Sequence, residues 1–259
     1  MVRAGFRRYA TYRQATVAGA ITNTVFGFLR AYVLLAVAAG AGGVAAGYQG
    51  DQLMTYVWVG QGLLVVVALW GWTDLADRIR TGEVATDLLR PINPVALYLA
   101  SDLGRAGHAL LFRLLPPVLV GALAFDLYLP ARPASWPLFG LSTGLAVVVC
   151  FGCRYLVNAV AYWLLDLRGV LAVWGIGAPV LAGLHFPLRF LPDWLAITTY
   201  LATPFASVVQ IPLDVLVERD PVPIQLALVG VQLGWAVLLL AACRLVQRRA
   251  ERRLVIQGG

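Results

Sequence analysis

Long apolar runs alternate with short polar stretches along the chain, and the runs have the length of membrane-spanning helices. A bilayer core of about 30 Å needs about 20 apolar residues in a helix. The boundary between the fourth and fifth runs is poorly marked, because the fourth is long and the fifth is short. The pattern predicts an all-α membrane protein, a single transmembrane domain over residues 1–259, with six transmembrane helices at residues 16–39, 52–73, 108–125, 136–165, 169–186 and 224–245.

The segment before the first span, residues 1–14, is amphipathic. Its arginines lie beside one apolar helical face, which is typical of a helix that lies along the inner membrane interface. A simple positively charged anchor would have a similar sequence, so both interpretations stay open. The apolar face consists of Val2, Phe6, Tyr9 and Ala10, and the arginines are Arg3, Arg7 and Arg8.

Residues 187–222, before the last span, are apolar but are interrupted by five prolines. Each proline limits the continuation of a helix. The segment therefore predicts short re-entrant extracellular helices, with Trp194 and Tyr200 suited to the membrane interface. The alternative is a seventh span, which would place the C-terminal arginines outside.

The stretch "IRTGEVATDLLRPINP", between the second and third spans, is charged and contains glycine and proline. Acidic residues begin and arginines end a predicted helix at residues 74–80, which matches the helix dipole, and Thr73 can cap it. Gly82 breaks this helix, and Asn93 with Pro94 begins the next one. An apolar stripe among the charges predicts that residues 74–94 form a docking surface, since a solvated connector does not need one. The stripe consists of Leu75, Ile79, Val84 and Leu88.

Composition supports a membrane protein. The chain is 60% hydrophobic and 13% charged, whereas soluble domains are typically about 45 to 50% apolar and about 25% charged. Residues 1–14 are already basic and mixed, so we expect no cleaved signal peptide.

The 20 basic residues are all arginine, and they orient the chain. Positive charge near span ends is retained in the cytoplasm. With both termini inside, fifteen arginines lie on the cytoplasmic side and three outside, at Arg132, Arg189 and Arg219. The even number of spans agrees with this orientation, and the net charge of +7 then needs no nucleic-acid partner.

Several kinds of chemistry are disfavoured. The absence of lysine excludes an ATP-binding P-loop, whose lysine reaches the terminal phosphates. Cys150 and Cys153 fall at lipid depth, where thiols pack as small hydrophobic groups, and two histidines do not build a metal site. No Asp or Glu lies at the centre of a predicted span, which argues against ion coupling. We therefore expect no catalytic residue and no metal.

A few polar and aromatic residues inside the spans are candidates for a translocation path or a partner interface. Arg30 lies within the first span and needs a partner or a polar cavity, unless its side chain extends to the interface. In the second span, the candidates could instead be packing or interfacial aromatic residues. They are Tyr56, Trp58 and Gln61.

Four segments carry a resemblance to a known family: "FRRYATYRQATVAGAITNTVFGFLRAYVLLA", "YVWVGQGL", "IRTGEVATDLLRPINP" and "HFPLRFLPDWLAITTYLATPF". The chain resembles the six-span permease subunits of type-2 ABC transporters. More narrowly, it is similar to the bacterial group that pairs two similar permeases with a separately encoded ATPase and includes drug and viologen exporters. The pattern I-R-x-G-x-x-x-x-L-L-R-P-x-N-P is the most specific part of the resemblance.

The resemblance implies an N-terminal amphipathic helix at residues 2–13, a cytoplasmic coupling helix at residues 74–86 and short extracellular helices at residues 187–220. In such permeases the coupling helix sits in a groove of the ATPase and transmits its closure. The implied coupling residues are Leu75, Ile79, Arg80, Gly82, Glu83, Val84 and Leu88.

The resemblance also implies partners and a place in the cell. Two ATPase copies would bind ATP and Mg²⁺, whereas this chain would bind no cofactor. A second, non-identical permease would complete a pathway for an amphiphilic drug, a cationic compound or a lipid-like molecule across the bacterial plasma membrane. The alternatives are an ion-coupled secondary transporter or channel, and a structural membrane scaffold.

Overall fold

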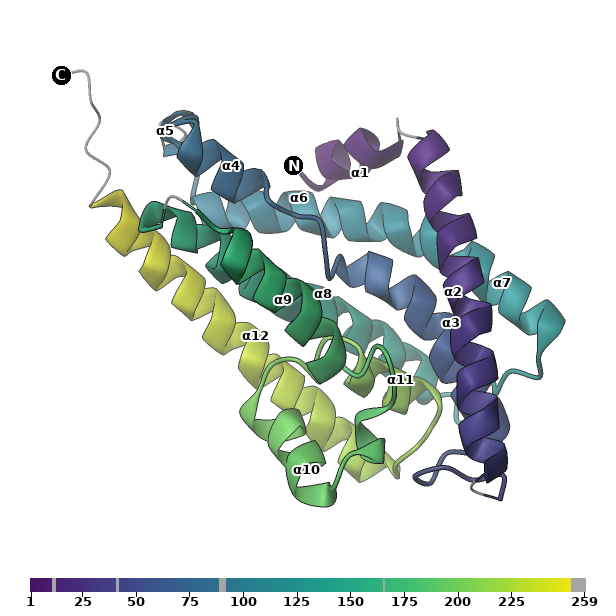
Figure 1. The fold of residues 1–259 in the computed structure, drawn as a ribbon. Helices are drawn as coiled ribbons and strands as arrows, with labels where there is room; N and C mark the ends of the chain where they lie inside the picture. The colour runs from purple at the N-terminus through teal and green to yellow at the C-terminus, as the bar shows by residue number, and fades with distance from the viewer. Residues whose placement is uncertain (11–12, 41, 89–91, 165, 253–259) are drawn as a thin grey trace.

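The computed structural model describes residues 1–10, 13–40, 42–88, 92–164 and 166–252, and these residues form helices without a β-strand. Figure 1 shows their arrangement. The segment η1 is a π-helix, and η2 and η3 are 3-10 helices. In chain order the helices are α1 (Val2–Ala10), α2 (Arg13–Gly40), α3 (Gly50–Val67), α4 (Asp74–Arg80), α5 (Val84–Leu88), α6 (Pro94–Ala109), η1 (Leu110–Leu114), α7 (Leu115–Ala124), α8 (Ser135–Ala159), η2 (Val160–Tyr162), α9 (Arg168–Leu181), η3 (Leu188–Phe190), α10 (Asp193–Ala202), α11 (Gln210–Leu216) and α12 (Val222–Glu251).

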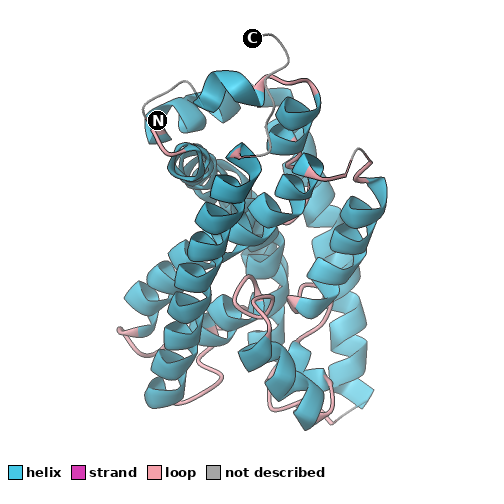
Figure 2. Cartoon of the chain, turned by 90° about the vertical axis from the view of Figure 1, so that its left-hand side faces the viewer, coloured by secondary structure: helices cyan, strands magenta, loops and turns pink. Residues whose placement is uncertain are grey.

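The long helices run between two ends of the molecule (Figure 1). We call one end the coupling end, after the coupling helix that the resemblance implies at residues 74–86; it contains α1, α4, α5 and the last turns of α12. The other, the distal end, contains α10, α11 and residues 42–49. The N-terminus lies at the coupling end in the turned view as well (Figure 2).

Four helical stretches in the described part of the chain are long and apolar enough to cross a membrane, so the predicted count of six spans is not confirmed. The other two predicted spans correspond to α3 and α9. Helix α9 has 14 residues, which extend about 21 Å and are too few for a bilayer core of about 30 Å. The four long stretches are Thr16–Gly40, Pro94–Ala124, Ser135–Tyr162 and Val222–Glu251.

One predicted helix boundary is wrong, and another predicted boundary is confirmed. Helix α3 ends at Val67 rather than at residue 73, because Ala68 and Gly71 adopt positive φ angles of 52° and 81° and turn the chain out of the helix. The third predicted span, residues 108–125, lies within a longer helical stretch that begins at Pro94, as the sequence predicts, because Asn93 caps it there and accepts hydrogen bonds from two backbone N–H groups.

The core lies where α3, α8, α11 and α12 meet. Helix α2 packs against α3 through a small residue. A Cβ on Gly27 would lie 2.6 Å from the ring of Trp58, and one on Gly121 of α7 would lie 2.3 Å from it. Trp58 therefore fills the seam between α2, α3 and α7, and only glycine permits this close approach.

Candidate functional site

Helices α4 and α5 form a projecting hairpin at the coupling end. Helix α4 spans Asp74–Arg80, as the charge pattern predicts, and Gly82 turns the chain with a φ of 79°. Thr73 occupies the N-cap position, but its hydroxyl donates to the carboxylate of Asp77 at 2.8 Å and makes no bond to a backbone N–H. The predicted turn is present, whereas the predicted side-chain cap is not.

The apolar stripe of the hairpin faces inward, so its interpretation as an exposed docking surface is wrong. Leu75 and Val84 are each only 1% exposed. They pack with Phe151, Tyr155 and Cys243 of α8 and α12, and Ile79 is partly buried against the same cluster. This burial satisfies the apolar residues within the chain itself. The side chain of Leu88 lies outside the described residues.

The surface that the hairpin presents is polar. Arg80, Thr81, Gly82 and Glu83 form its tip and are exposed. A Cβ built on Gly82 would meet no atom within 4 Å. We define these four residues as the coupling tip. Three of them, Arg80, Gly82 and Glu83, are among the coupling residues that the resemblance implies.

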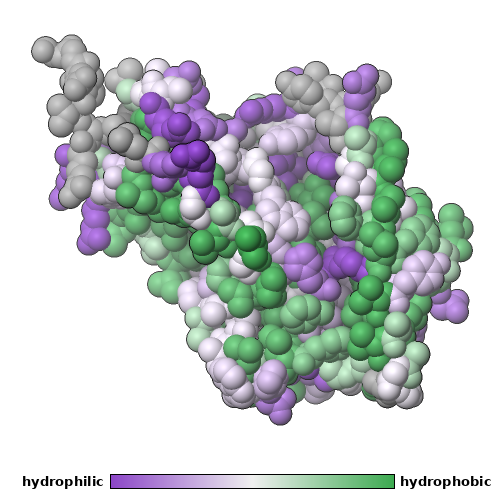
Figure 3. All heavy atoms as spheres, in the orientation of Figure 1, coloured by the Kyte–Doolittle hydropathy of each residue, from purple (hydrophilic) through white to green (hydrophobic). Residues whose placement is uncertain are grey.

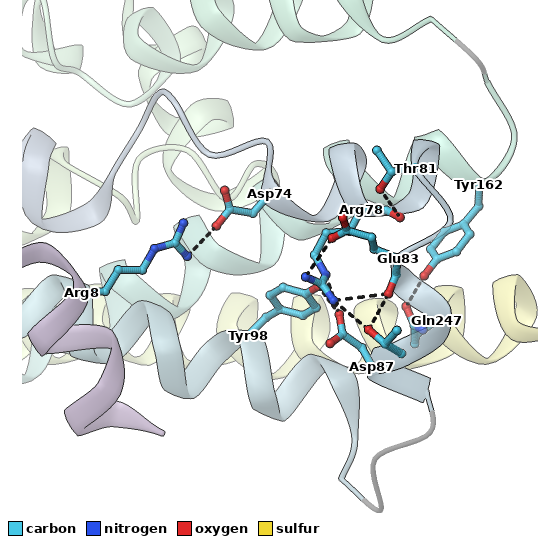
Figure 4. Close-up of polar contacts among 10 residues, drawn as sticks. Arg8, Asp74, Arg78, Thr81, Glu83, Asp87, Tyr98, Tyr162 and Gln247 are labelled. Carbon is cyan, nitrogen blue, oxygen red and sulfur yellow. Dashed lines mark hydrogen bonds and ion pairs between the residues drawn. The ribbon is translucent and has the colours of Figure 1, made fainter.

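Arg78 fixes α4 to α5 (Figure 4). Its Nε donates to Asp87 at 2.9 Å, and one of its terminal nitrogens donates to Thr86 at 3.1 Å and to the backbone carbonyl of Glu83 at 3.3 Å. Burial lowers the pKa of Arg78, but the hydrogen bond and charge of Asp87 outweigh it and hold the pKa above its ordinary value. Asp87 also accepts from the hydroxyl of Tyr98 on α6 at 2.8 Å, so the hairpin is tied to the helix that follows it.

A second anchor joins α4 to α8. The side-chain oxygen of Asn158 accepts from the backbone N–H of Ala76 at 3.2 Å, and its nitrogen donates to the carbonyl of Trp72 at 3.0 Å. Asn158 is 1% exposed. Because a buried amide without partners is costly, these bonds constrain where α4 sits on α8.

A buried ion triad lies beneath the hairpin. Asp102 of α6 accepts from Arg105 at 2.7 Å and from Arg154 of α8 at 2.7 Å. All three side chains are less than a tenth exposed. The span pattern missed this site, although the spacing of Asp102 and Arg105 by three residues on one helical face was available as a signal.

The triad continues to the end of α3. The terminal nitrogens of Arg105 donate to the carbonyls of Val65 and Val66, both at 2.9 Å. These belong to the last turn of the helix, whose carbonyls carry partial negative charge; the Val65 carbonyl also accepts from the backbone N–H of Ala68 at 3.2 Å. The guanidinium of Arg154 also lies 5.4 Å from the ring centre of Trp72. A continuous set of contacts therefore joins the hairpin to α3, α6 and α8.

The predicted pathway residues of the second span lie in helix packing. Trp58 and Gln61 are 0% and 2% exposed. Tyr56 is also buried and donates to the carbonyl of Gly183 at 2.6 Å and to Gln210 at 2.7 Å. These contacts join α3 to the distal end, and a role in lining a pathway stays a prediction.

Arg30 lies on α2, and its Nε is buried without a hydrogen-bond partner among the described residues. Arg30 interacts electrostatically with Tyr56 on α3 and with His185 in the segment after α9. The role of Arg30 in a pathway or a partner interface also stays a prediction.

The described residues contain no group of three or more His, Cys, Asp or Glu side chains arranged to hold a metal. Cys150, Cys153 and Cys243 are buried free thiols, placed in the packing between α8 and α12. The site thus consists of hydrogen bonds and ion pairs that hold helices together.

Comparison with protein families gives one finding. A family model described as "ABC-2 family transporter protein" matches residues 25–258. Searches of curated proteins and of solved structures gave no match.

Proposed function

The chain belongs to the ABC-2 family of transporter proteins, and from this premise we propose that it is a permease subunit of an ATP-driven exporter for an amphiphilic substrate. A permease of this family is a membrane component that works with a separate ATPase. We further propose that two ATPase copies dock at the coupling end and bind ATP and Mg²⁺. A second permease, non-identical to this one, would complete the pathway in a bacterial plasma membrane, with both termini in the cytoplasm.

The single observation that carries this proposal is the construction of the hairpin. Its tip is exposed and polar, while its base is fixed to α6 through Arg78 and Asp87 and to α8 through Asn158. A solvated connector does not need such anchors. A rigid hairpin moves as a unit, so displacement of its tip by an ATPase would displace α6 and α8.

The burial of Leu75 and Val84 changes which residues should contact the ATPase. Contact through the coupling tip would rely on Arg80 and Glu83 together with exposed backbone groups around Gly82. Charged groups at such a surface give specificity and speed of association more than raw affinity.

The proposal is tested by reversing both charges of the tip, Arg80→Glu with Glu83→Arg. Wild-type chain carrying an affinity tag is purified from native membranes, and the retained ATPase is identified by mass spectrometry. We expect the double variant to lose most of this ATPase while staying inserted, because neither side chain packs in the core.

Arg168→Glu provides the matched control, since Arg168 is an exposed arginine outside the hairpin. It should retain the ATPase. Full retention by the double variant, together with normal efflux, would reduce the hairpin to a connector and remove the main support for the proposal.

Efflux must also stop when ATP is depleted, and it must survive a protonophore. Efflux that follows the proton gradient without ATP would instead favour an ion-coupled transporter. The purified chain alone should hydrolyse no ATP, because it has no lysine for a phosphate-binding loop.

A further inference from the structure

A cavity of about 280 Å³ opens beside the end of α3, between the hairpin and η1. Three of its lining residues are Arg105, His108 and Arg113, which come from the continuous helix of α6 and η1. Its described lining contains no Asp or Glu. Asp102, which lies on the same helix as Arg105, is paired with Arg105 and Arg154. The cavity therefore carries uncompensated positive charge.

Arg113 is the least satisfied of these groups. Its Nε is buried and has no hydrogen-bond partner in the described part of the chain. The charged group that acts on it is Arg105, a second cation. The guanidinium lies over Gly19 of α2, where a Cβ would fall 1.9 Å from the terminal nitrogen. Arg113 as a whole is half-buried, but a buried N–H of its guanidinium without an acceptor is costly unless a ligand supplies one.

The backbone at Arg113 is also unusual. Residues Leu110–Leu114 form a π-helix, which occurs frequently at functional sites. The physical cause is in the sequence, because Pro116 and Pro117 have no N–H to donate to the carbonyls four residues earlier. The wider turn places Arg113 toward α2 and α3 rather than continuing the regular face of α6.

The remaining walls suit an amphiphile. Tyr9, Trp70 and Trp72 contribute aromatic surface, and Leu64, Val65 and Ala109 contribute apolar surface. Figure 3 shows the same face hollowed between α2 and the pair α4 and α9, with hydrophilic atoms inside a hydrophobic surround. An anion at the arginines would leave an attached chain against these apolar walls.

We propose that this cavity binds the anionic head group, phosphate or carboxylate, of an amphiphile. The inference extends the proposed function by assigning a charge to its ligand, and it disfavours the cationic compounds that the resemblance includes. It does not depend on ATPase docking, since binding is a property of the chain itself. The source of the head group is either a lipid of the inner leaflet or a transported amphiphile.

Binding is measured by calorimetry on the full chain, purified in a neutral detergent, with monododecyl phosphate as the probe. Dodecyltrimethylammonium tests the sign of the charge, and inorganic phosphate tests the need for a tail. We expect the phosphate amphiphile to bind about tenfold or more tightly than either, because hydrogen bonds to charged groups are the strong ones.

The variant Arg113→Gln should weaken this binding about tenfold or more, and Arg113→Lys should recover part of it. Gly19→Leu fills the space beside the guanidinium without removing charge and should also weaken binding. Arg168→Gln removes an exposed arginine outside the cavity and should bind like the wild type. Circular dichroism and gel filtration show which variants fold. If Arg113→Gln does not fold, the binding measured for Gly19→Leu and Arg113→Lys tests the site instead.

Three results would overturn the site: unchanged binding by the folded Arg113 and Gly19 variants, equally tight binding of the quaternary ammonium, or equally tight binding of inorganic phosphate. In nanodiscs, brominated phosphatidylglycerol should quench tryptophan fluorescence more than brominated phosphatidylcholine if the ligand is a lipid. Arg113-dependent binding of dodecyl phosphate without that difference identifies the ligand as a transported amphiphile. If the wild-type chain retains no ATPase, or if the Arg80→Glu, Glu83→Arg variant retains all of it with normal efflux, while dodecyl phosphate binding is intact, the proposed function fails but the site stands.

Discussion

Two buried carboxylates, one near each end of the molecule, are held in opposite ways. Asp102 at the coupling end lies between the guanidinium groups of Arg105 and Arg154. Asp214 of α11, at the distal end, accepts instead from the hydroxyls of Tyr48, at 2.5 Å, and Tyr200, and from Gln210 at 2.9 Å. The first accepts hydrogen bonds from cations, and the second accepts them from neutral groups.

The carboxylate at the distal end responds to pH. Burial raises the pKa of Asp214 to about 6, although the hydrogen bonds from Tyr200 and Tyr48 and the charge of Arg189 oppose this. The distal end therefore contains a carboxylate that titrates near neutral pH. The coupling end is instead held by the ion pairs of Asp102 with Arg105 and Arg154.

The largest effect should come from Asp102→Asn. This change leaves two buried guanidinium groups without a counter-charge, and breaking a buried ion pair typically costs about 3 to 5 kcal/mol. We expect a large drop in the thermal stability of the purified chain in detergent. Asp74→Asn is the control, because Asp74 forms an exposed pair. A loss below about 1 kcal/mol would show that the triad is not holding α6 to α8.

A smaller effect, with a defined pH dependence, should come from Asp214→Asn. The folded-state pKa is raised from 3.8 to about 6, so the protonated form is favoured in the native state. This contribution to stability is complete below pH 4 and is lost as the pH rises through about 6, by about 3 kcal/mol in total.

Thermal unfolding of the wild type should therefore shift to lower temperature between pH 4 and pH 7.5. The Asn variant should show a flatter profile over that interval, because it has no proton to lose. Parallel profiles for the two proteins would mean that Asp214 does not titrate there.

The comparison also shows what the sequence could predict. Local signals gave the bounds of α4, the turn at Gly82 and the start of α6 at Asn93 and Pro94. Each of these depends on dipole, φ preference or capping within a few residues, so no knowledge of the tertiary structure is needed.

Contacts between distant segments could not be predicted in this way. Leu75 and Val84 look like a docking stripe until α8 and α12 are placed against them. Asp102 looks like an ordinary polar residue before a span, because Arg154 is far away in sequence. The end of α3 was overestimated because apolar residues continue past Ala68, where φ becomes positive. A pattern of apolar residues indicates that they are buried, but it does not show which segment of the chain or which partner covers them.

A further test contrasts two acids that lie four residues apart at the distal end. Burial raises the pKa of Glu218, but hydrogen bonds from the hydroxyls of Ser135 and Tyr128 and from Arg132 outweigh it and lower the pKa to about 2. Its stabilisation is therefore present above pH 4.5 and is lost as the pH falls through about 2, the reverse of Asp214. Glu218→Gln should cost about 2 kcal/mol at pH 7.

The free energy difference between Glu218→Gln and wild type should shrink as the pH is lowered from 4.5 toward 2. The difference for Asp214→Asn should instead change between pH 4 and 7. Identical profiles for the two variants would contradict the assignment of opposite pKa shifts to these neighbouring acids.

The smallest effect should come from Arg8→Gln. Arg8 of α1 pairs with Asp74 of α4 at 3.1 Å, but the two side chains are 63% and 42% exposed (Figure 4). Water and salt screen such a pair, which is typically worth about 0 to 1 kcal/mol. Helix α1 is held mainly by close packing on α6, where a Cβ on Gly104 would lie 2.0 Å from the carbonyl of Val2. Arg8→Gln should therefore leave the thermal stability almost unchanged at both low and high salt. Gly104→Leu should instead release α1 from α6 and expose sites near residue 10 to protease. If Arg8→Gln instead lowered the thermal stability as much as Asp102→Asn, burial would not determine how much each ion pair of this end stabilises the fold. The contrast between the buried triad and the surface pair would then fail.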